Sequence, residues 1–145
     1  MTAREAERDV GVFEYRVAPP VSELSLNTLF SAARGHHRWR RFASMHRRSL
    51  VYLCAYYRNQ VVGYVNVVWD GGTRGFLVDL TVHPEYRGRG IGTALVERAV
   101  EVANRRGVGS LRAEFGTDEV EFYRRLGFES VDAGVRRLEG VRRGS

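Results

Sequence analysis

The segment Leu80-Thr-Val-His-Pro-Glu-Tyr-Arg-Gly-Arg-Gly-Ile-Gly-Thr93 decides the fold, because a strand, a glycine-rich turn and a helix meet within it. The strand ends where Pro84 follows His83, since proline cannot continue a sheet. Glycines then alternate with larger residues in the order Arg87, Gly88, Arg89, Gly90, Ile91 and Gly92. Glycine lets backbone N–H groups approach an anion, and a helix start adds unpaired N–H groups and partial positive charge. The segment therefore predicts a cradle for a pyrophosphate group.

Two familiar phosphate-binding patterns do not fit this turn. The Walker pattern ends in Gly-Lys-Ser/Thr, and this chain contains no lysine, because all 23 of its basic residues are arginine. The dinucleotide fingerprint Gly-x-Gly-x-x-Gly differs from the Gly-x-Gly-x-Gly found here and would open a parallel unit. A glycine-rich connection without any ligand is the plain structural alternative.

Hydrophobic periodicity on both sides of this segment predicts one domain with alternating strands and helices. Alternating or continuous apolar runs indicate strands at 12–17, 50–57, 61–69, 75–83, 110–115 and 128–138. Helical spacing and capping residues indicate helices at 22–35, 36–49, 90–106 and 118–126, of which 36–49 is strongly basic. This order predicts a mixed α/β sheet flanked by helices.

Composition narrows the classes of function. The chain has 145 residues, 43% of them hydrophobic, which suits one globular domain with a sizeable core. It has no apolar run of about 18 residues and no apolar signal core at its charged N-terminus, so we expect a cytoplasmic protein without a membrane partner. The lone Cys54 lies in an apolar run and is expected in the core.

The net charge of +6 favours an anionic partner. A phosphate-bearing cofactor fits better than nucleic acid, since no nucleic-acid-binding signature is present.

Two motifs carry a resemblance to a known family. The stretch Arg87-Gly-Arg-Gly-Ile-Gly92 resembles the Arg/Gln-x-x-Gly-x-Gly/Ala motif of the GNAT superfamily of N-acetyltransferases. Its second hallmark, Phe-Tyr-x-x-Leu-Gly-Phe, is matched by Phe122–Phe128, and 63–72 is similar to small uncharacterised bacterial members. The resemblance covers about 12–138 of a single domain, 1–145. It implies a mostly antiparallel central sheet in which two splayed strands form a cleft for acetyl-CoA.

The same resemblance implies which residues hold the cofactor and what the protein does. Pantetheine is expected on the strand edge at Leu80, Thr81 and Val82, and the pyrophosphate on Arg87, Gly88, Arg89, Gly90, Ile91, Gly92 and Thr93. The expected reaction moves the acetyl group to a primary amine of a small molecule or peptide. A homodimer is a further expectation. The alternative is a catalytically silent module that senses acetyl-CoA.

Acetyl transfer needs an unprotonated amine, a stabilised carbonyl oxygen and a proton for the departing thiolate. By resemblance Tyr123 lies near the cofactor sulfur and donates that proton, and its alternative role is packing. Asp79 and Glu114 fall in apolar settings on the splaying strands and are candidate bases, with water as an alternative. Asp79 could instead hold the neighbouring loop by hydrogen bonds. No cluster has metal-ligand spacing, so no metal is expected.

The acceptor is expected over the first helices and the hairpin, where His36, His37, Trp39 and Asn66 are candidate lining residues. If the basic helix faces this site, it favours an acidic acceptor or contacts the cofactor 3′-phosphate. The alternative is that Trp39 belongs to the core and the arginines form a solvated face.

Overall fold

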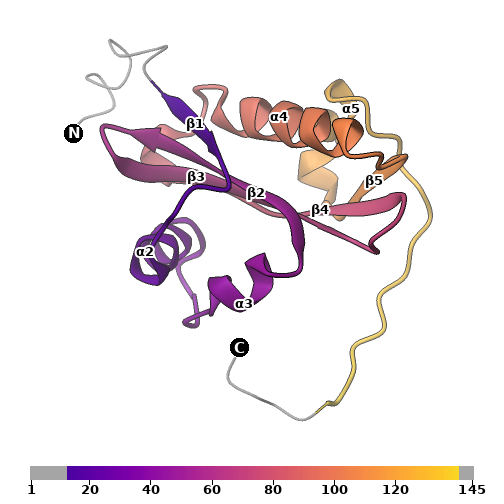
Figure 1. The fold of residues 1–145 in the computed structure, drawn as a ribbon, viewed down its shortest axis with the longest axis horizontal. Coiled ribbons are helices and arrows are strands. Elements are labelled where there is room, and N and C mark those ends of the chain that lie inside the picture. The colour runs from indigo at the N-terminus through magenta and orange to yellow at the C-terminus, as the bar shows by residue number, and fades with distance from the viewer. Residues whose placement is uncertain (1–12, 141–145) are drawn as a thin grey trace.

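The computed structural model describes residues 13–140 and contains one five-stranded sheet (Figure 1). Its strands lie in sequence order: β1 (Glu14–Val17), β2 (Ser49–Tyr57), β3 (Gln60–Trp69), β4 (Arg74–Val82) and β5 (Ser110–Ala113). The first three pairings are antiparallel, and the β4–β5 pairing is parallel. The expected mixed and mostly antiparallel sheet is therefore confirmed.

Helices cover both faces of this sheet (Figure 1). Helix α4 (Ile91–Arg105) crosses one face, and α2 (Glu23–Arg34) and α3 (Phe42–His46) cover the other. Between β5 and the short helix α5 (Val120–Arg125) lies the 3₁₀ turn η2 (Thr117–Glu119), and a second such turn, η1 (Pro84–Tyr86), follows β4. The two-sided arrangement explains why β2 and β3 read as nearly continuous apolar runs, since both of their faces are buried.

Each face of the sheet has its own core. On the α4 face the helix buries the predicted stripe of Ile91, Leu95 and Ala99 against β2, β3 and β4. On the opposite face Phe30 and Phe42 pack around the ring of Tyr64. Full burial of one such side chain stabilises a fold by about 1.5–3 kcal/mol. Cys54 is fully buried as expected, and burial raises the pKa of its thiol to about 12.

The strand expected at 128–138 is not formed. Residues 128–140 have no regular secondary structure, and the apolar side chains of Val131, Val135 and Leu138 are exposed. Apolar alternation stabilises a strand only if one side of the strand is buried, and here it is interrupted by Gly134 and meets no covering layer. The prediction was wrong because periodicity alone cannot say whether a partner surface exists.

The basic helix expected over 36–49 is also wrong in extent, because only Phe42–His46 is helical. The side chain of Asn27 explains the difference. Its Oδ1 accepts the backbone N–H of Arg40 at 2.8 Å, and its Nδ2 donates to the Arg40 carbonyl at 3.0 Å. A backbone held in this way cannot continue as helix.

Other boundaries move by a few residues. The last helix begins at Val120 after the 3₁₀ turn, and β5 ends at Ala113, so Glu114 lies beyond it. Val12, the expected first residue of β1, and the expected frayed tail 141–145 lie outside the described residues. Within the described part of the chain, no helix has the length and apolarity required to cross a lipid bilayer.

Candidate functional site

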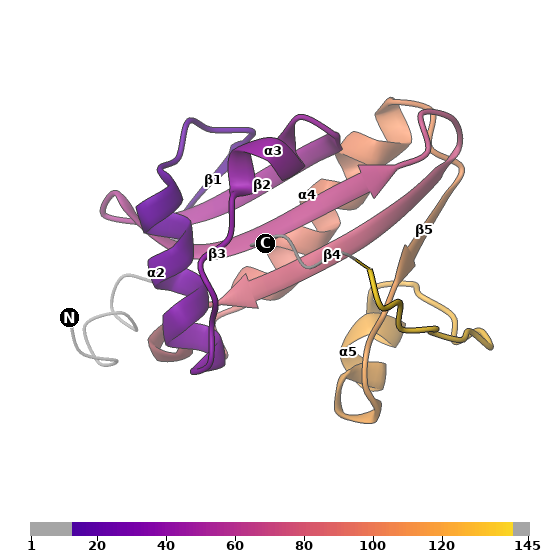
Figure 2. The same ribbon diagram turned by 90° about the horizontal axis from the view of Figure 1, so that it is seen from below.

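Strands β4 and β5 separate part of the way along the sheet (Figure 2). They pair only from Arg74–Ser110 to Leu77–Ala113, while β4 continues to Val82 beside β3. The β5-facing backbone edge of residues 78–82 is therefore left without a strand partner. This is the splay that the family resemblance implies, and it creates an exposed edge to which an extended ligand can bind.

A cleft of about 540 Å³ lies at this splay. It brings together nine of the ten predicted cofactor-binding residues: Leu80, Thr81, Val82, Arg87, Gly88, Gly90, Ile91, Gly92 and Thr93. The tenth, Arg89, is half-buried and does not line the cleft. The remaining lining residues, which were not predicted to bind the cofactor, are Ala33, Arg34, Tyr86, Asp118, Glu119 and Phe122.

The glycine-rich turn has a backbone that only glycine adopts easily. Gly88 and Gly90 have φ values of 77° and 81°, and Gly90 is the N-cap of α4 without any side-chain cap. A Cβ atom built on either glycine meets nothing within 4 Å, so the space in front of the turn is open. Uncapped N–H groups at a helix start facing open space suit an anion such as pyrophosphate.

Arg34, at the end of α2, joins the cleft to the strand beside it. Its Nη2 donates to the Thr81 hydroxyl at 3.2 Å and lies 3.5 Å from Oδ1 of Asp79. Nearby, Nη2 of Arg87 donates to the Ala33 carbonyl at 3.3 Å. The sequence shows Arg34 only as one of the basic residues at the end of a predicted helix. Its position in the cleft could not be predicted, because it depends on how α2 packs against the sheet.

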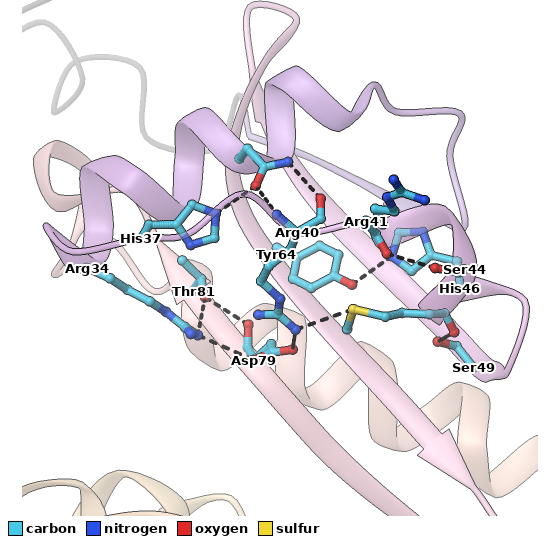
Figure 3. A network of polar contacts seen from close by, with 12 residues as sticks. Arg34, His37, Arg40, Arg41, Ser44, His46, Ser49, Tyr64, Asp79 and Thr81 are labelled. Atoms are coloured by element: carbon cyan, nitrogen blue, oxygen red, sulfur yellow. Dashed lines mark hydrogen bonds and ion pairs between the residues drawn. The ribbon is translucent and has the colours of Figure 1, made fainter. Parts of the chain in front are cut away.

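Asp79 occupies a bulge in β4, and its side chain faces the arginines of the neighbouring segment (Figure 3). Its φ is 59°, and the β3–β4 register shifts between Tyr64 and Asn66 at this point. One carboxylate oxygen faces Arg34, and the other accepts from Nη2 of Arg40 at 2.8 Å. Asp79 therefore lies in an ion-pair network with the segment between α2 and α3, which corresponds to the holding role considered above.

Tyr123 lies on α5 with 3% of its surface exposed. Its ring stacks on Phe115 at 4.6 Å between centroids and meets Phe122 and Phe128 edge-on. Burial raises the pKa of its phenol, and the charge of Glu119 adds to this shift. Within residues 13–140 its hydroxyl has no hydrogen-bond partner, and the residue does not line the cleft, although its neighbour Phe122 does. Its role as proton donor stays a prediction.

Among the described residues, no hydrogen bond, ion pair or ring contact joins any two of the three predicted catalytic residues. Asp79 pairs with residues of the α2–α3 face, whereas Tyr123 packs into the core on the α4 face. Glu114 is exposed, so the apolar setting expected for it is wrong, because β5 ends one residue earlier. The structure thus contains a cleft at the splay, and the roles of the candidate acid and the candidate bases stay predictions.

The candidate acceptor residues divide between surface and core. Trp39 is 56% exposed, which makes its expected alternative as a core residue wrong, and His36 is also exposed. Asn66 is fully buried, and His37 shares a 2.7 Å hydrogen bond with Oδ1 of Asn27. Sequence reasoning missed His46, whose Nε2 lies 2.7 Å from the Tyr64 hydroxyl while its ring stacks on Tyr52.

Comparison with known proteins agrees with this architecture. An uncharacterized N-acetyltransferase of Methanocaldococcus jannaschii is 41% identical over 68 residues, which are 45% of this chain and 30% of that protein. The chloroplastic GCN5-related N-acetyltransferase 2 of Arabidopsis thaliana is 32% identical over 77 residues, 53% of this chain and 30% of that protein. This chain thus matches about a third of the length of these relatives.

The fold is shared with solved structures along nearly the whole chain. A GNAT family acetyltransferase of Streptococcus pneumoniae superposes with a TM-score of 0.72 at 24% identity, covering 89% of this chain and 100% of that one. The model of the acetyltransferase (GNAT) family matches residues 19–128, which include the splayed strands, the glycine-rich turn and the Phe-Tyr motif. The chain therefore belongs to the acetyltransferase (GNAT) family.

Proposed function

We propose that this protein is an N-acetyltransferase that moves the acetyl group of acetyl-CoA to a primary amine. The observation that carries the proposal is the cleft at the β4–β5 splay, which has the glycine-rich N-terminus of α4 in its wall. An extended donor with a phosphate group at one end requires both features together. A free strand edge alone, or an uncapped helix alone, would be a much weaker indication.

Each wall of the cleft has a binding role in this proposal. The unpaired β4 edge at Leu80 and Val82 offers backbone groups to the amides of pantetheine, as an added strand would. The N–H groups at the start of α4 hold the pyrophosphate, and the exposed Arg87 adds formal charge. Acetyl-CoA supplies the thioester as donor, with its acetyl end directed toward the bulge at Asp79.

The proposed reaction needs only a proton donor, a base and a positioning residue from this chain or from water. The amine nitrogen forms a bond to the acetyl carbon as the carbon–sulfur bond breaks, and Tyr123 is proposed to give a proton to the departing sulfur. Burial raises the Tyr123 pKa, so its hydroxyl is protonated before the reaction and can donate to the sulfur as negative charge develops there in the transition state. Because arginines engage both oxygens of Asp79, we assign it a positioning role. Glu114 or water then takes the proton of the amine.

The proposals on location, partners and oligomeric state are those that the sequence analysis reached. We propose a cytoplasmic location, a small-molecule or peptide acceptor, no nucleic-acid or membrane partner, and a homodimer. Size-exclusion chromatography with light scattering tests the last of these directly.

Two measurements on the full chain test the function. Calorimetric titration with acetyl-CoA should give saturable binding, and a panel of primary amines should include one that accelerates free-thiol release from acetyl-CoA. Binding without turnover on any amine supports the silent sensor instead. Lack of acetyl-CoA binding by the folded protein rejects the proposal.

A further inference from the structure

Residues 34–48, which run from the last residue of α2 through α3 and are called the α2–α3 segment below, carry an unbalanced positive charge. Between Glu23 and Asp70 the sequence contains no aspartate or glutamate, yet six arginines lie between positions 34 and 48: Arg34, Arg38, Arg40, Arg41, Arg47 and Arg48. His36, His37 and His46 lie in the same stretch. Such a one-sided charge distribution produces a strong local field that attracts anions.

Among the described residues, two carboxylates reach this segment from outside, and both are already engaged. Glu23 accepts the backbone N–H groups of Phe42 and Ala43 at 2.8 Å each, where α3 begins. Asp79 is held by Arg34 and Arg40. Neither carboxylate pairs with an exposed arginine further along the segment.

Four exposed guanidinium groups are left without a counter-charge: Arg38, Arg41, Arg47 and Arg48. Within residues 13–140, none of the four forms an ion pair with a carboxylate. The exposed indole of Trp39 lies between Arg38 and Arg40 in the sequence. The segment therefore presents four exposed arginines, whose guanidinium groups are forked hydrogen-bond donors, together with an exposed indole.

This basic surface adjoins the proposed reaction centre. Arg34 lines the donor cleft, and Arg34 and Arg40 both reach Asp79 at the bulge (Figure 3). The α2–α3 segment thus bounds the end of the cleft to which we assign the acetyl group. An acceptor that reaches this end of the cleft is therefore exposed to the positive field of this segment. The pKa of His37 is lowered first by burial and then by the charges of Arg40 and Arg34, as expected in a positive field.

We infer that the acceptor is an amine that also carries carboxylate or phosphate groups, which the α2–α3 arginines bind while the amine reaches the thioester. This inference rests on the proposed acetyltransferase function and specifies its substrate class. Guanidinium groups bind both kinds of anion in a forked geometry. Polycationic amines and strongly basic peptides would be repelled from the same surface.

Two matched series of acceptors test the inference with the full chain. The peptide series is Ala-Asp-Asp-Ala, Ala-Asn-Asn-Ala and Ala-Arg-Arg-Ala, and the small-molecule series is O-phosphoethanolamine, ethanolamine and 1,3-diaminopropane. In at least one series kcat/KM from thiol release should be about tenfold or more higher for the anionic member than for the neutral one. The series in which this preference is found identifies the anion as peptide carboxylate or small-molecule phosphate. The preference should decrease as salt is raised.

Charge removal tests whether the surface itself is responsible. The double variant Arg38→Gln, Arg41→Gln should lose most of the anionic preference, while its affinity for acetyl-CoA stays unchanged. Arg105→Gln is the matched control, because Arg105 is an exposed arginine at the end of α4, the helix that covers the opposite face of the sheet from α2 and α3 (Figure 1). It should keep both the preference and the acetyl-CoA affinity.

Several outcomes would overturn the inference while leaving the proposed function intact. Equal or better turnover of the cationic members is one. A double variant that keeps the anionic preference but binds acetyl-CoA more weakly is another, because the arginines would then serve the cofactor phosphates. If no amine in either series is turned over, the affinities of N-acetylated Ala-Asp-Asp-Ala and N-acetylated Ala-Arg-Arg-Ala are measured by calorimetry instead. Equal affinities, or tighter binding of the arginine peptide, reject the inference. Tighter binding of a single-stranded RNA oligomer than of the acidic peptide also rejects it.

Discussion

Nη2 of Arg40 lies 2.8 Å from Oδ2 of Asp79, whose backbone φ is 59°. Aspartate and asparagine tolerate this left-handed conformation better than most other residues. The ion pair therefore joins the loop before α3 to the one irregular point of the β3–β4 pairing. Because β4 leaves β5 just before this bulge, the contact connects the basic segment with the wall of the cleft.

Substitutions at Asp79 should separate the contribution of charge from that of backbone conformation. Asp79→Asn keeps a residue that tolerates positive φ but leaves two arginines uncompensated, and we expect a loss of about 1–3 kcal/mol in the free energy of unfolding. Asp79→Ala should lose about 1 kcal/mol more, because alanine is strained at this φ. Urea denaturation measures both. Equal stability of the two variants would contradict the backbone part of the argument.

Gly90→Ala should weaken acetyl-CoA binding by more than tenfold, or about 1.4 kcal/mol, because alanine disfavours the left-handed cap that directs N–H groups into the cleft. Gly107→Ala is a matched control. Gly107 also has positive φ, 86°, and a Cβ atom there also meets nothing within 4 Å, but it follows the other end of α4. Both variants should lose similar stability, whereas calorimetry should show weaker cofactor binding for Gly90→Ala alone.

Tyr123→Phe keeps the stack on Phe115 and deletes only the hydroxyl. If that hydroxyl protonates the departing thiolate, kcat should fall by about 10²–10⁴-fold with little change in KM for acetyl-CoA. The thermal midpoint should hardly move, since within the described residues no hydrogen bond is lost. Tyr56→Phe, which changes a buried tyrosine in the other core, should leave kcat unchanged. Full turnover by Tyr123→Phe would remove the proton-donor role.

The stability of the fold should decrease in mild acid partly through His46. Burial lowers the pKa of this imidazole below its usual 6.5, and the charge of Glu23 opposes the shift. As the pH falls through about 6.5, the unfolded chain takes up a proton that folded His46 resists, so stability present above this pH is lost below it. His46→Asn should therefore show a smaller decrease in the free energy of unfolding between about pH 7.5 and 5.

The exposed His36 on the same segment supplies the comparison for this experiment. His36→Asn should reproduce the pH dependence of the wild-type protein in denaturation curves recorded across the same range. An unchanged slope in His46→Asn would mean that other groups produce the acid sensitivity.

Much of the fold could be predicted from local sequence. The stripe of Ile91, Leu95 and Ala99 has helical spacing and forms one side of a core, so periodicity sufficed for α4. The glycine-rich turn could also be predicted from the sequence, because positive φ and close approach to a ligand both select glycine. These features depend on neighbours within a few residues, and the sequence by itself determined them.

Tertiary structure decided what lies opposite each of these elements. The pattern at 128–138 looked like a strand, yet within the described residues no surface covers Val131, Val135 or Leu138. Residues 36–41 looked helical, yet Asn27 on α2 holds the backbone of Arg40 in another conformation. Arg34 and Asp79 are 45 positions apart and meet only because α2 packs across β4. Contacts between distant segments depend on which surfaces are buried together, and a local pattern contains no information about its partner.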